Sequence, residues 1–179
     1  MQINGFKNSC VGKSLRLFKR SVCCAILAVF CLPFATTSVV SKPCENTRVD
    51  LRGDWGQANF NVTLADTTES RALGLMHVEH LPEHKGMLFI YPGESKVAFW
   101  MKNTLIPLDM LFFDATGKMT GLHKNAQPHD LTPKVGGEAV KYVLEINGGL
   151  SKALGINQNT VLRHPALAGA GIWPCGVDE

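Results

Sequence analysis

The sequence lacks the short glycine-rich and nucleophile motifs that identify many enzymes. It contains no GxGxxG or GxxxxGK phosphate-binding pattern, no GxSxG nucleophile turn and no CxxC pair. It also shows no internal repeat and no low-complexity segment. A nucleotide-binding fold and a serine nucleophile therefore have no support, and we expect no cofactor.

Acidic residues are missing from the start of the chain. All 15 Asp and Glu residues follow residue 44, whereas five of the 18 Lys and Arg residues lie within residues 1–20. From residue 39 onward the chain has 13 basic and 15 acidic residues, so the pI near 8.5 is due to the basic N-terminal segment. The sequence therefore offers no basic face for nucleic acid. Its 179 residues, 45% of them hydrophobic and 18% charged, suit a single globular domain.

The N-terminal segment has the pattern of a secretory signal peptide. A basic region over residues 1–20 precedes an apolar core over residues 21–34, and small residues follow near 35–38. The apolar core is shorter than the roughly 20 residues that a membrane-spanning helix needs. We therefore predict a signal peptide over residues 1–38, and a periplasmic or secreted protein that is not integral to the membrane after cleavage. The alternative is an uncleaved N-terminal membrane anchor.

Cleavage would leave only two of the six cysteines, Cys44 and Cys175. A single pair in an exported domain is typical of a disulfide, because the compartment is oxidising. Metal ligands or free thiols are the alternatives. The domain would then comprise residues 45–163, followed by a flexible tail over residues 164–179 that Cys175 tethers.

Short apolar segments between turn residues predict a mainly β protein. We expect a single compact β-barrel or sandwich with one or two short helices, and no βαβ fold. Asp66, with Glu69 three residues later, predicts the start of a short helix that runs to Leu73. A second helical turn is expected at 150–154, and a hairpin turn at 114–118. The expected strands are residues 60–66, 86–91, 96–101, 108–113, 138–146 and 159–163.

The segment from residue 97 to residue 109 concentrates polar groups between two apolar runs. Strand alternation places Trp100 and Lys102 on one face and Met101 on the other. If the two flanking strands pair, Lys102 and Asp109 approach each other at the base of the link. One interpretation is structural, with a Lys102–Asp109 ion pair and Asn103 shaping the turn. The other is a pocket for a small polar ligand, lined by these polar groups and the indole.

The pieces RALGLM, GMLF and FWMKNTLIPLD occur in this order within residues 71–109. Together with VLEINGG they resemble domain-of-unknown-function family 192, a group of small, often exported, β-rich bacterial and archaeal proteins. The resemblance spans roughly residues 59–162 and implies the fold but no activity. The Gly-Asp turn usual before the last strand is replaced here by Gln158 and Asn159.

The family pattern draws two further polar residues into the candidate site. Arg71, on the predicted short helix, would form an ion pair with Asp109 or Glu145, and an anion clamp is the alternative. The candidate ligand-binding residues are therefore Arg71, Trp100, Lys102, Asn103, Asp109 and Glu145.

Three histidines offer a weak candidate for a copper site. His77, His80 and His84 lie between two methionines, and an exported protein can encounter copper. Pro82 interrupts the segment, however, and the histidines are not part of the family pattern. We interpret them as surface residues and predict no metal site.

These observations predict an exported envelope or periplasmic protein that binds a small polar ligand or glycan. The second function considered is an enzyme that acts on a cell-envelope substrate through Lys102 and Asp109. The third is a structural module that binds a partner protein.

Overall fold

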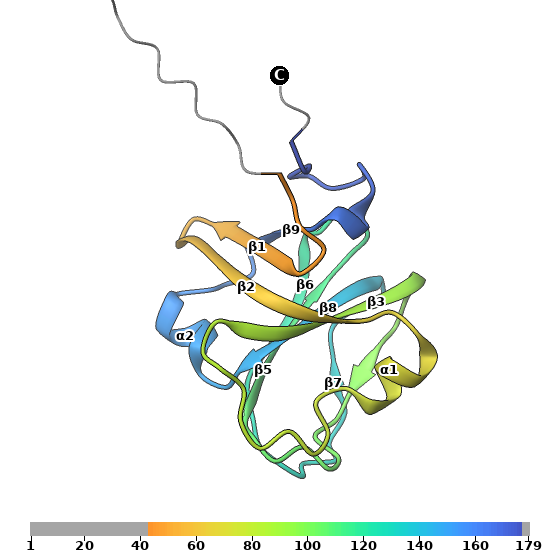
Figure 1. Cartoon of the computed structure of the whole chain (residues 1–179), viewed down its shortest axis with the longest axis vertical. Coiled ribbons are helices and arrows are strands. Elements are labelled where there is room, and N and C mark those ends of the chain that lie inside the picture. Colours follow the sequence, from red (N-terminus) through yellow and green to blue (C-terminus); the bar gives the residue numbers. More distant parts are fainter. Residues whose placement is uncertain (1–42, 177–179) are drawn as a thin grey trace, which may run out of the picture. The chain divides into compact units, whose positions relative to one another are not determined.

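The computed structural model describes residues 43–176 (Figure 1). The predicted signal peptide, residues 1–38, lies outside the described residues. Within residues 43–176, no helix is long and apolar enough to cross a membrane.

The described part of the chain is mainly β, as predicted (Figure 1). Seven strands form one sheet in the order β6-β5-β8-β3-β2-β1-β9, and β4 pairs with β7 in a separate ribbon. In chain order the elements are β1 (Arg48–Gly53), β2 (Gly56–Ala65), α1 (Thr68–Leu73), β3 (Lys85–Ser95), β4 (Ala98–Phe99), β5 (Leu108–Phe113), β6 (Met119–Ala126), β7 (Lys134–Val135), β8 (Val140–Asn147), α2 (Leu150–Leu154), β9 (Val161–Arg163) and the 3-10 turn η1 (Pro165–Leu167).

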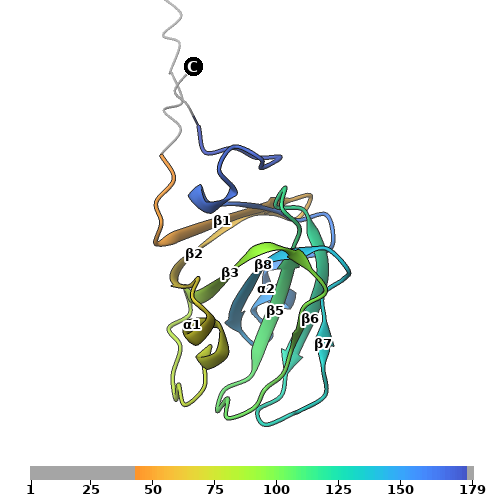
Figure 2. The same ribbon diagram turned by 90° about the vertical axis from the view of Figure 1, so that its right-hand side faces the viewer.

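The large sheet is curled (Figure 2), and hydrogen bonds join its two outer strands, β9 and β6, at one end. The N–H of Leu162 in β9 donates to the carbonyl of Gly117 at 2.8 Å, and the N–H of Met119 in β6 donates to the carbonyl of Thr160 at 3.1 Å. These bonds give both edges partners at one end of the sheet, which limits the exposed edge that could pair with another chain. The result is a half-barrel.

One connection differs from the hairpins that the sequence suggested. β2 and β3 pair in parallel, with α1 in the crossover between them, so the sheet contains one βαβ unit although the fold as a whole is mainly β, as predicted. The N-cap of this helix is Thr67, one residue later than the predicted Asp66. Thr67 accepts a hydrogen bond from the Ser70 N–H, and the Ser70 hydroxyl accepts one from the Thr67 N–H. This reciprocal box replaces the expected Asp66–Glu69 pair.

The expected strand at 96–101 shrinks to the two residues of β4, because its partner is the equally short β7. Strands β1 and β6 were not predicted as strands at all. The fold class nevertheless follows from the other strands, five of which lie within a few residues of their predicted ranges.

The sheet is buried on both faces, which gives the domain two hydrophobic cores. The first core fills the curl, and its large members include Phe60, Leu88, Leu111, Tyr142, Leu144 and Leu162. The second core lies between the other face of the sheet and a layer made by the segment after α1 and the β4 region, and its members include Leu75, Phe89, Met101, Met110, Phe112 and Val143.

A buried carboxylate joins three separate elements. Asp109 of β5 is fully buried, and its carboxylate accepts hydrogen bonds from the main-chain N–H groups of Asn125 at 2.6 Å, Gly149 at 2.8 Å and Ser151 at 2.6 Å. These donors belong to the end of β6 and to the start of α2. Charge-assisted bonds of this kind are stronger than bonds between neutral groups. Asp109 thus fixes the start of β5 against α2 and β6.

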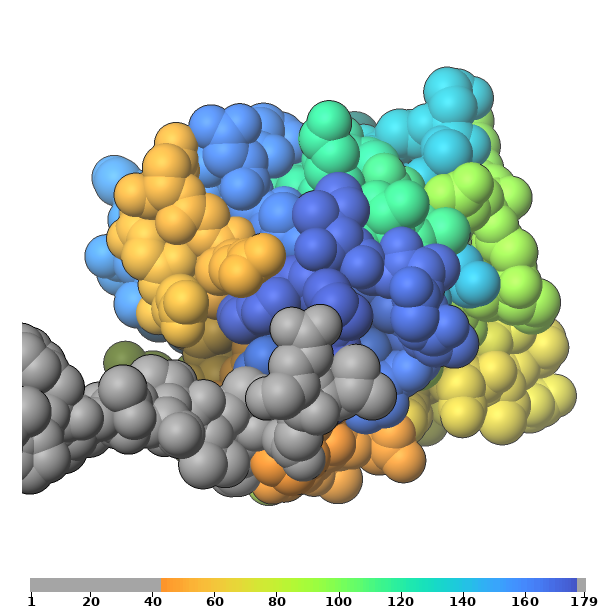
Figure 3. Space-filling view, turned by 90° about the horizontal axis from the view of Figure 1, so that it is seen from above, coloured from red at the N-terminus to blue at the C-terminus, as the bar shows by residue number. Residues whose placement is uncertain are grey.

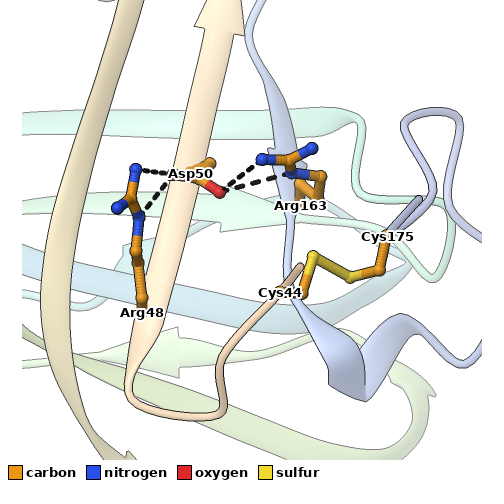
Figure 4. A network of polar contacts seen from close by, with 5 residues as sticks. All are labelled: Cys44, Arg48, Asp50, Arg163 and Cys175. Carbon is orange, nitrogen blue, oxygen red and sulfur yellow. Dashed lines mark hydrogen bonds and ion pairs between the residues drawn. A yellow bond between two sulfur atoms is a disulfide. The ribbon is translucent and has the colours of Figure 1, made fainter. Parts of the chain in front are cut away.

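The two ends of the described chain are held together near β1 and β9 (Figure 4). Cys44 and Cys175 form a disulfide with their Cα atoms 5.4 Å apart. Beside it, Asp50 binds Arg48 and Arg163, each at 2.8 Å, and so links β1 to β9. The predicted cysteine pair is therefore present in the structure.

Residues 164–176 pack against the domain, whereas the sequence suggested a flexible tail. The Tyr142 hydroxyl donates to the carbonyl of Ala166 at 3.0 Å, and Leu167 is buried in the first core. The guanidinium groups of Arg52 and Arg163 both lie over the Trp173 ring, 4.4 and 4.3 Å from its centroid. In Figure 3 this segment, dark blue, covers the domain beside the first described residues, orange.

We expect the disulfide to be detectable without any functional assay. Proteolysis of the oxidised chain should release the Cys44 and Cys175 peptides joined, and reductant should separate them. Because the bond closes a segment with a sequence separation of 131, the Cys44→Ser/Cys175→Ser double variant should lose about 2–5 kcal/mol of unfolding free energy. Recovery of separate peptides without reductant would contradict the pairing.

The Asp109 carboxylate leads to a second prediction. Asp109→Asn places an amide N–H2 group against main-chain donors, so the free energy of unfolding should fall by about 3 kcal/mol or more. The matched control is Asp66→Asn, at an exposed carboxylate, which should change stability by less than about 0.5 kcal/mol. Chemical denaturation measures both. Equal stability of the two variants would show that Asp109 does not hold these elements together.

Candidate functional site

A cavity of about 210 Å³ opens on the side of the second core. Its walls are the last turn of α1 with the residues that follow it, the middle of β3, and the segment from Ala98 to Thr104. One residue of β8, Glu145, completes the lining. Of the six predicted ligand-binding residues, four line the cavity: Arg71, Trp100, Lys102 and Glu145.

Glu145 is the buried polar group of this cavity. It is 4% exposed, and within residues 43–176 no hydrogen bond or ion pair engages its carboxyl group. Its neighbours across the sheet are Met87 on β3 and Met110 on β5. Burial raises the pKa of the Glu145 carboxyl from 4.5 to about 8, because an apolar surrounding disfavours the charged form. The group is therefore a neutral acid at pH 7.

Arg71 of α1 contributes a positive charge to the cavity lining. One terminal nitrogen of its guanidinium donates to the carbonyl oxygens of Asp66 at 2.6 Å and Ile90 at 2.9 Å. These bonds tie the last turn of α1 to β3. The guanidinium also lies 5.3 Å from the centroid of the Tyr91 ring. The predicted ion pair of Arg71 with Asp109 or Glu145 is wrong, because the guanidinium uses one terminal nitrogen for main-chain carbonyls and contacts neither carboxyl group.

Trp100 and Lys102 point into the cavity mouth because the residue between them is anchored. The Met101 side chain is fully buried, its N–H donates to the carbonyl of Asp130 at 2.8 Å, and its carbonyl accepts from the N–H of His129 at 3.0 Å. Its neighbours Trp100 and Lys102 are both exposed and both line the cavity. Trp100 is 52% exposed, and the Lys102 ammonium lies 5.5 Å from its ring centroid, within cation–π range. The predicted faces of this segment are confirmed.

Two predicted site residues do not reach the cavity. Asn103 shapes the turn, with φ of 54°, and its carbonyl accepts the N–H of His77 at 2.9 Å. Asp109 points to the other face of the sheet, since it lies opposite Ile146, whereas its neighbour Met110 lies opposite Glu145. A shift of one residue along a strand reverses the face. The predicted Lys102–Asp109 pair is therefore wrong.

Aromatic residues complete the apolar part of the cavity, and sequence reasoning missed them. Phe89 and Phe99 meet edge to face with centroids 4.8 Å apart, and Phe112 continues the stack at 5.7 Å from Phe99. Tyr91 follows Phe89 by two residues on β3 and lines the same cavity. Burial raises the pKa of the Tyr91 hydroxyl, Arg71 opposes that shift, and Glu145 adds to it. The two-residue spacing from Phe89 was the available signal for Tyr91.

The three histidines lie at the surface of the described structure. His77, His80 and His84 are all exposed. No three His, Cys, Asp or Glu side chains in the described range 43–176 lie together as metal ligands would.

The unusual turn at Gln158 and Asn159 serves the fold and does not line the cavity. Asn157 and Asn159 donate to the carboxylate of Asp54 at 2.7 and 3.0 Å. These two hydrogen bonds lower the pKa of Asp54. The turn thus joins the β1–β2 hairpin to the segment before β9.

Two solved structures are similar to this chain. A protein of unknown function from Novosphingobium aromaticivorans is 33% identical, with a TM-score of 0.63, and the match covers 69% of this chain and 93% of that protein. A putative transcription regulator from Sinorhizobium meliloti is 35% identical, with a TM-score of 0.65, and the match covers 70% and 98%. Among curated proteins, none matches.

The family model of DUF192, described as an uncharacterized ACR, matches residues 49–164. This range contains the whole cavity lining and eight of the nine described strands in full. The chain therefore belongs to domain-of-unknown-function family 192.

Proposed function

We propose that this chain is an exported protein that binds a small polar ligand in the cavity between α1, β3 and the Ala98–Thr104 segment. The observation that carries the proposal is the Glu145 carboxyl group, which is buried in the cavity lining without a hydrogen bond or ion pair in the described structure.

A buried carboxyl group without a partner costs free energy of folding. Glu145 lies between Met87 and Met110 on a face that is otherwise mostly apolar, so an apolar side chain would suit the fold better there. Functional sites commonly retain such costly groups, because the ligand supplies the missing partner. A ligand that hydrogen-bonds to Glu145 would remove the penalty.

The size of the cavity suits one small molecule. Its volume is about 210 Å³, and for scale a cavity of roughly 150 Å³ can hold benzene. A ring of the size of a monosaccharide fits this range. Half-exposed Trp100 offers an aromatic surface at the mouth, while Arg71, Lys102 and Glu145 offer polar contacts.

Two features support export. The basic region and the apolar core over residues 1–34 have the order of a signal peptide. The disulfide between Cys44 and Cys175 fits an oxidising compartment such as the periplasm. The envelope is therefore the proposed source of the ligand.

Catalysis is the second candidate, and one observation favours it. The pKa of Glu145, raised to about 8, lies near the operating pH that suits a general acid or base. Lys102 and Asp109 cannot share such a role, since Asp109 lies on the opposite face of the sheet. An enzyme of this kind would use Glu145 on a small envelope-derived substrate bound beside Trp100.

Binding can be tested with a panel of monosaccharides, uronic acids and amino acids in a thermal-shift assay. At least one compound should raise the melting temperature of the wild-type chain, because a ligand that binds only the folded state stabilises it. Trp100→Ala and Lys102→Met should each lower the affinity for that compound about tenfold or more, which corresponds to roughly 1.4 kcal/mol of binding free energy.

The variants serve as their own stability check. Both side chains are exposed, so the unliganded stability of each variant should stay within about 1 kcal/mol of wild type. Lys124→Met, on β6 and outside the cavity lining, is the matched control and should bind as wild type does. A panel without any shift in wild type would argue against the proposed function.

Glu145→Gln should stabilise the unliganded protein at alkaline pH. Because the pKa of Glu145 is raised on folding, the folded state keeps its proton between pH 4.5 and about 8, while the unfolded state loses it. Wild-type stability should therefore fall over this window and level off above pH 8. The amide in Glu145→Gln does not ionise, so the free energy of unfolding of the variant should not fall with pH in this way. At pH 8 the variant should therefore be more stable than wild type by on the order of 3 kcal/mol.

Chemical denaturation at pH 4.5 and pH 8 measures the difference. The stability difference between Glu145→Gln and wild type should nearly vanish at pH 4.5, where residue 145 is neutral in both folded proteins. Glu69→Gln, at an exposed residue of α1, is the control and should show no comparable change. Destabilisation of Glu145→Gln at pH 8 would mean that the carboxylate is held charged and paired.

A further inference from the structure

The polar groups of the cavity are unbalanced in charge. Arg71 and Lys102 carry positive charges, and within residues 43–176 neither forms an ion pair with a carboxylate. Glu145 is the one acidic residue in the lining, and it keeps its proton at neutral pH because its pKa is raised to about 8. The cavity therefore presents two cations and one acidic O–H to whatever enters it.

We propose that the ligand is a small carboxylate, whose charged group lies among the Glu145 carboxyl and the cations of Arg71 and Lys102. This inference rests on the proposed function, since it assumes that the cavity binds a ligand. It adds the chemical class of that ligand.

The donor set fits a carboxylate better than a neutral or cationic group. The Glu145 O–H can donate to a carboxylate oxygen in a short, charge-assisted hydrogen bond. Arg71 uses one terminal nitrogen for main-chain carbonyls, which leaves the other side of its guanidinium fork to bind an anion. A neutral sugar would leave both cations without a counter-charge, and a cationic ligand would face two like charges.

The α1 helix disfavours a dianionic phosphate. On this wall the lining residues, 71–76, are its last turn and the residues after it, so the negative end of the helix faces the site and opposes a dianion more than a monoanion. A singly charged carboxylate suits two cations and one proton donor.

The arrangement makes binding depend on pH. The titratable groups that share the cavity with Glu145 are Arg71 from α1, Tyr91 from β3 and Lys102 after β4, while its cross-strand neighbours are Met87 and Met110. Tyr91 stays neutral, since burial raises the pKa of its hydroxyl above 10. Glu145 is therefore the group that changes charge between pH 6.5 and pH 9. Once ionised, it repels a carboxylate.

The test is calorimetric titration of the full chain with matched pairs of probes, D-glucuronate with D-glucose and lactate with lactamide. Glucose 6-phosphate and choline are titrated beside them as the phosphate and the cationic probe. At pH 6.5 at least one carboxylate should bind, at least tenfold tighter than its neutral partner. Its affinity should fall at least tenfold at pH 9. In Glu145→Gln the affinity should no longer fall between pH 6.5 and pH 9, because the amide does not ionise. Lys124→Met should behave as wild type does.

Each other outcome overturns a defined statement. Equal or tighter binding of the neutral partners, or tighter binding of glucose 6-phosphate or choline, overturns the carboxylate class and leaves the proposed function intact. An unchanged pH response in Glu145→Gln overturns the part assigned to Glu145. Absence of binding by all of these probes, together with a silent thermal-shift panel, overturns both the inference and the proposed function.

Discussion

The hydrogen bonds to the buried Asp109 carboxylate are the interaction on which the arrangement of this domain depends. Three main-chain N–H groups from two other elements converge on one side chain at the start of β5. They hold β5 against the end of β6 and the start of α2, in a sheet where Met110 lies opposite Glu145 of β8. Because strand side chains alternate between faces, this register decides which residues meet the cavity and which meet the first core.

Two buried carboxyl groups on neighbouring strands thus have opposite energetic roles. Asp109 is surrounded by donors, so its charge stabilises the fold. Glu145 lies on the neighbouring strand β8, opposite Met110, and on the other face of the sheet. Its carboxyl group has no partner in the described structure, so burial favours the protonated form. The same sheet provides a structural anchor on one side and an unsatisfied polar group on the other. That asymmetry is why the second face is the candidate site.

The cavity depends on long-range anchoring as well as on its own residues. Met101 is held by the loop at residues 129–130, and this places Trp100 and Lys102 at the mouth. Arg71 joins α1 to β3 through main-chain carbonyls and still presents its charge to the lining. Each cavity wall is therefore also a tertiary contact, so a variant that loosens one wall should change the shape of the site.

The sequence by itself determined the β class, most strand positions, the pairing of Cys44 with Cys175 and the alternation around Met101, because these follow from local periodicity and composition. The tertiary structure decided the rest. It set the parallel β2–β3 pair, the packing of the segment after β9, and the face of each acidic residue. These depend on which strands pair and in which register, and residues far apart in the chain fix that choice. Local pattern placed Asp109 beside Lys102, whereas the strand pairing puts Asp109 opposite Ile146 on one face of the sheet and Glu145 on the other face, in the cavity lining.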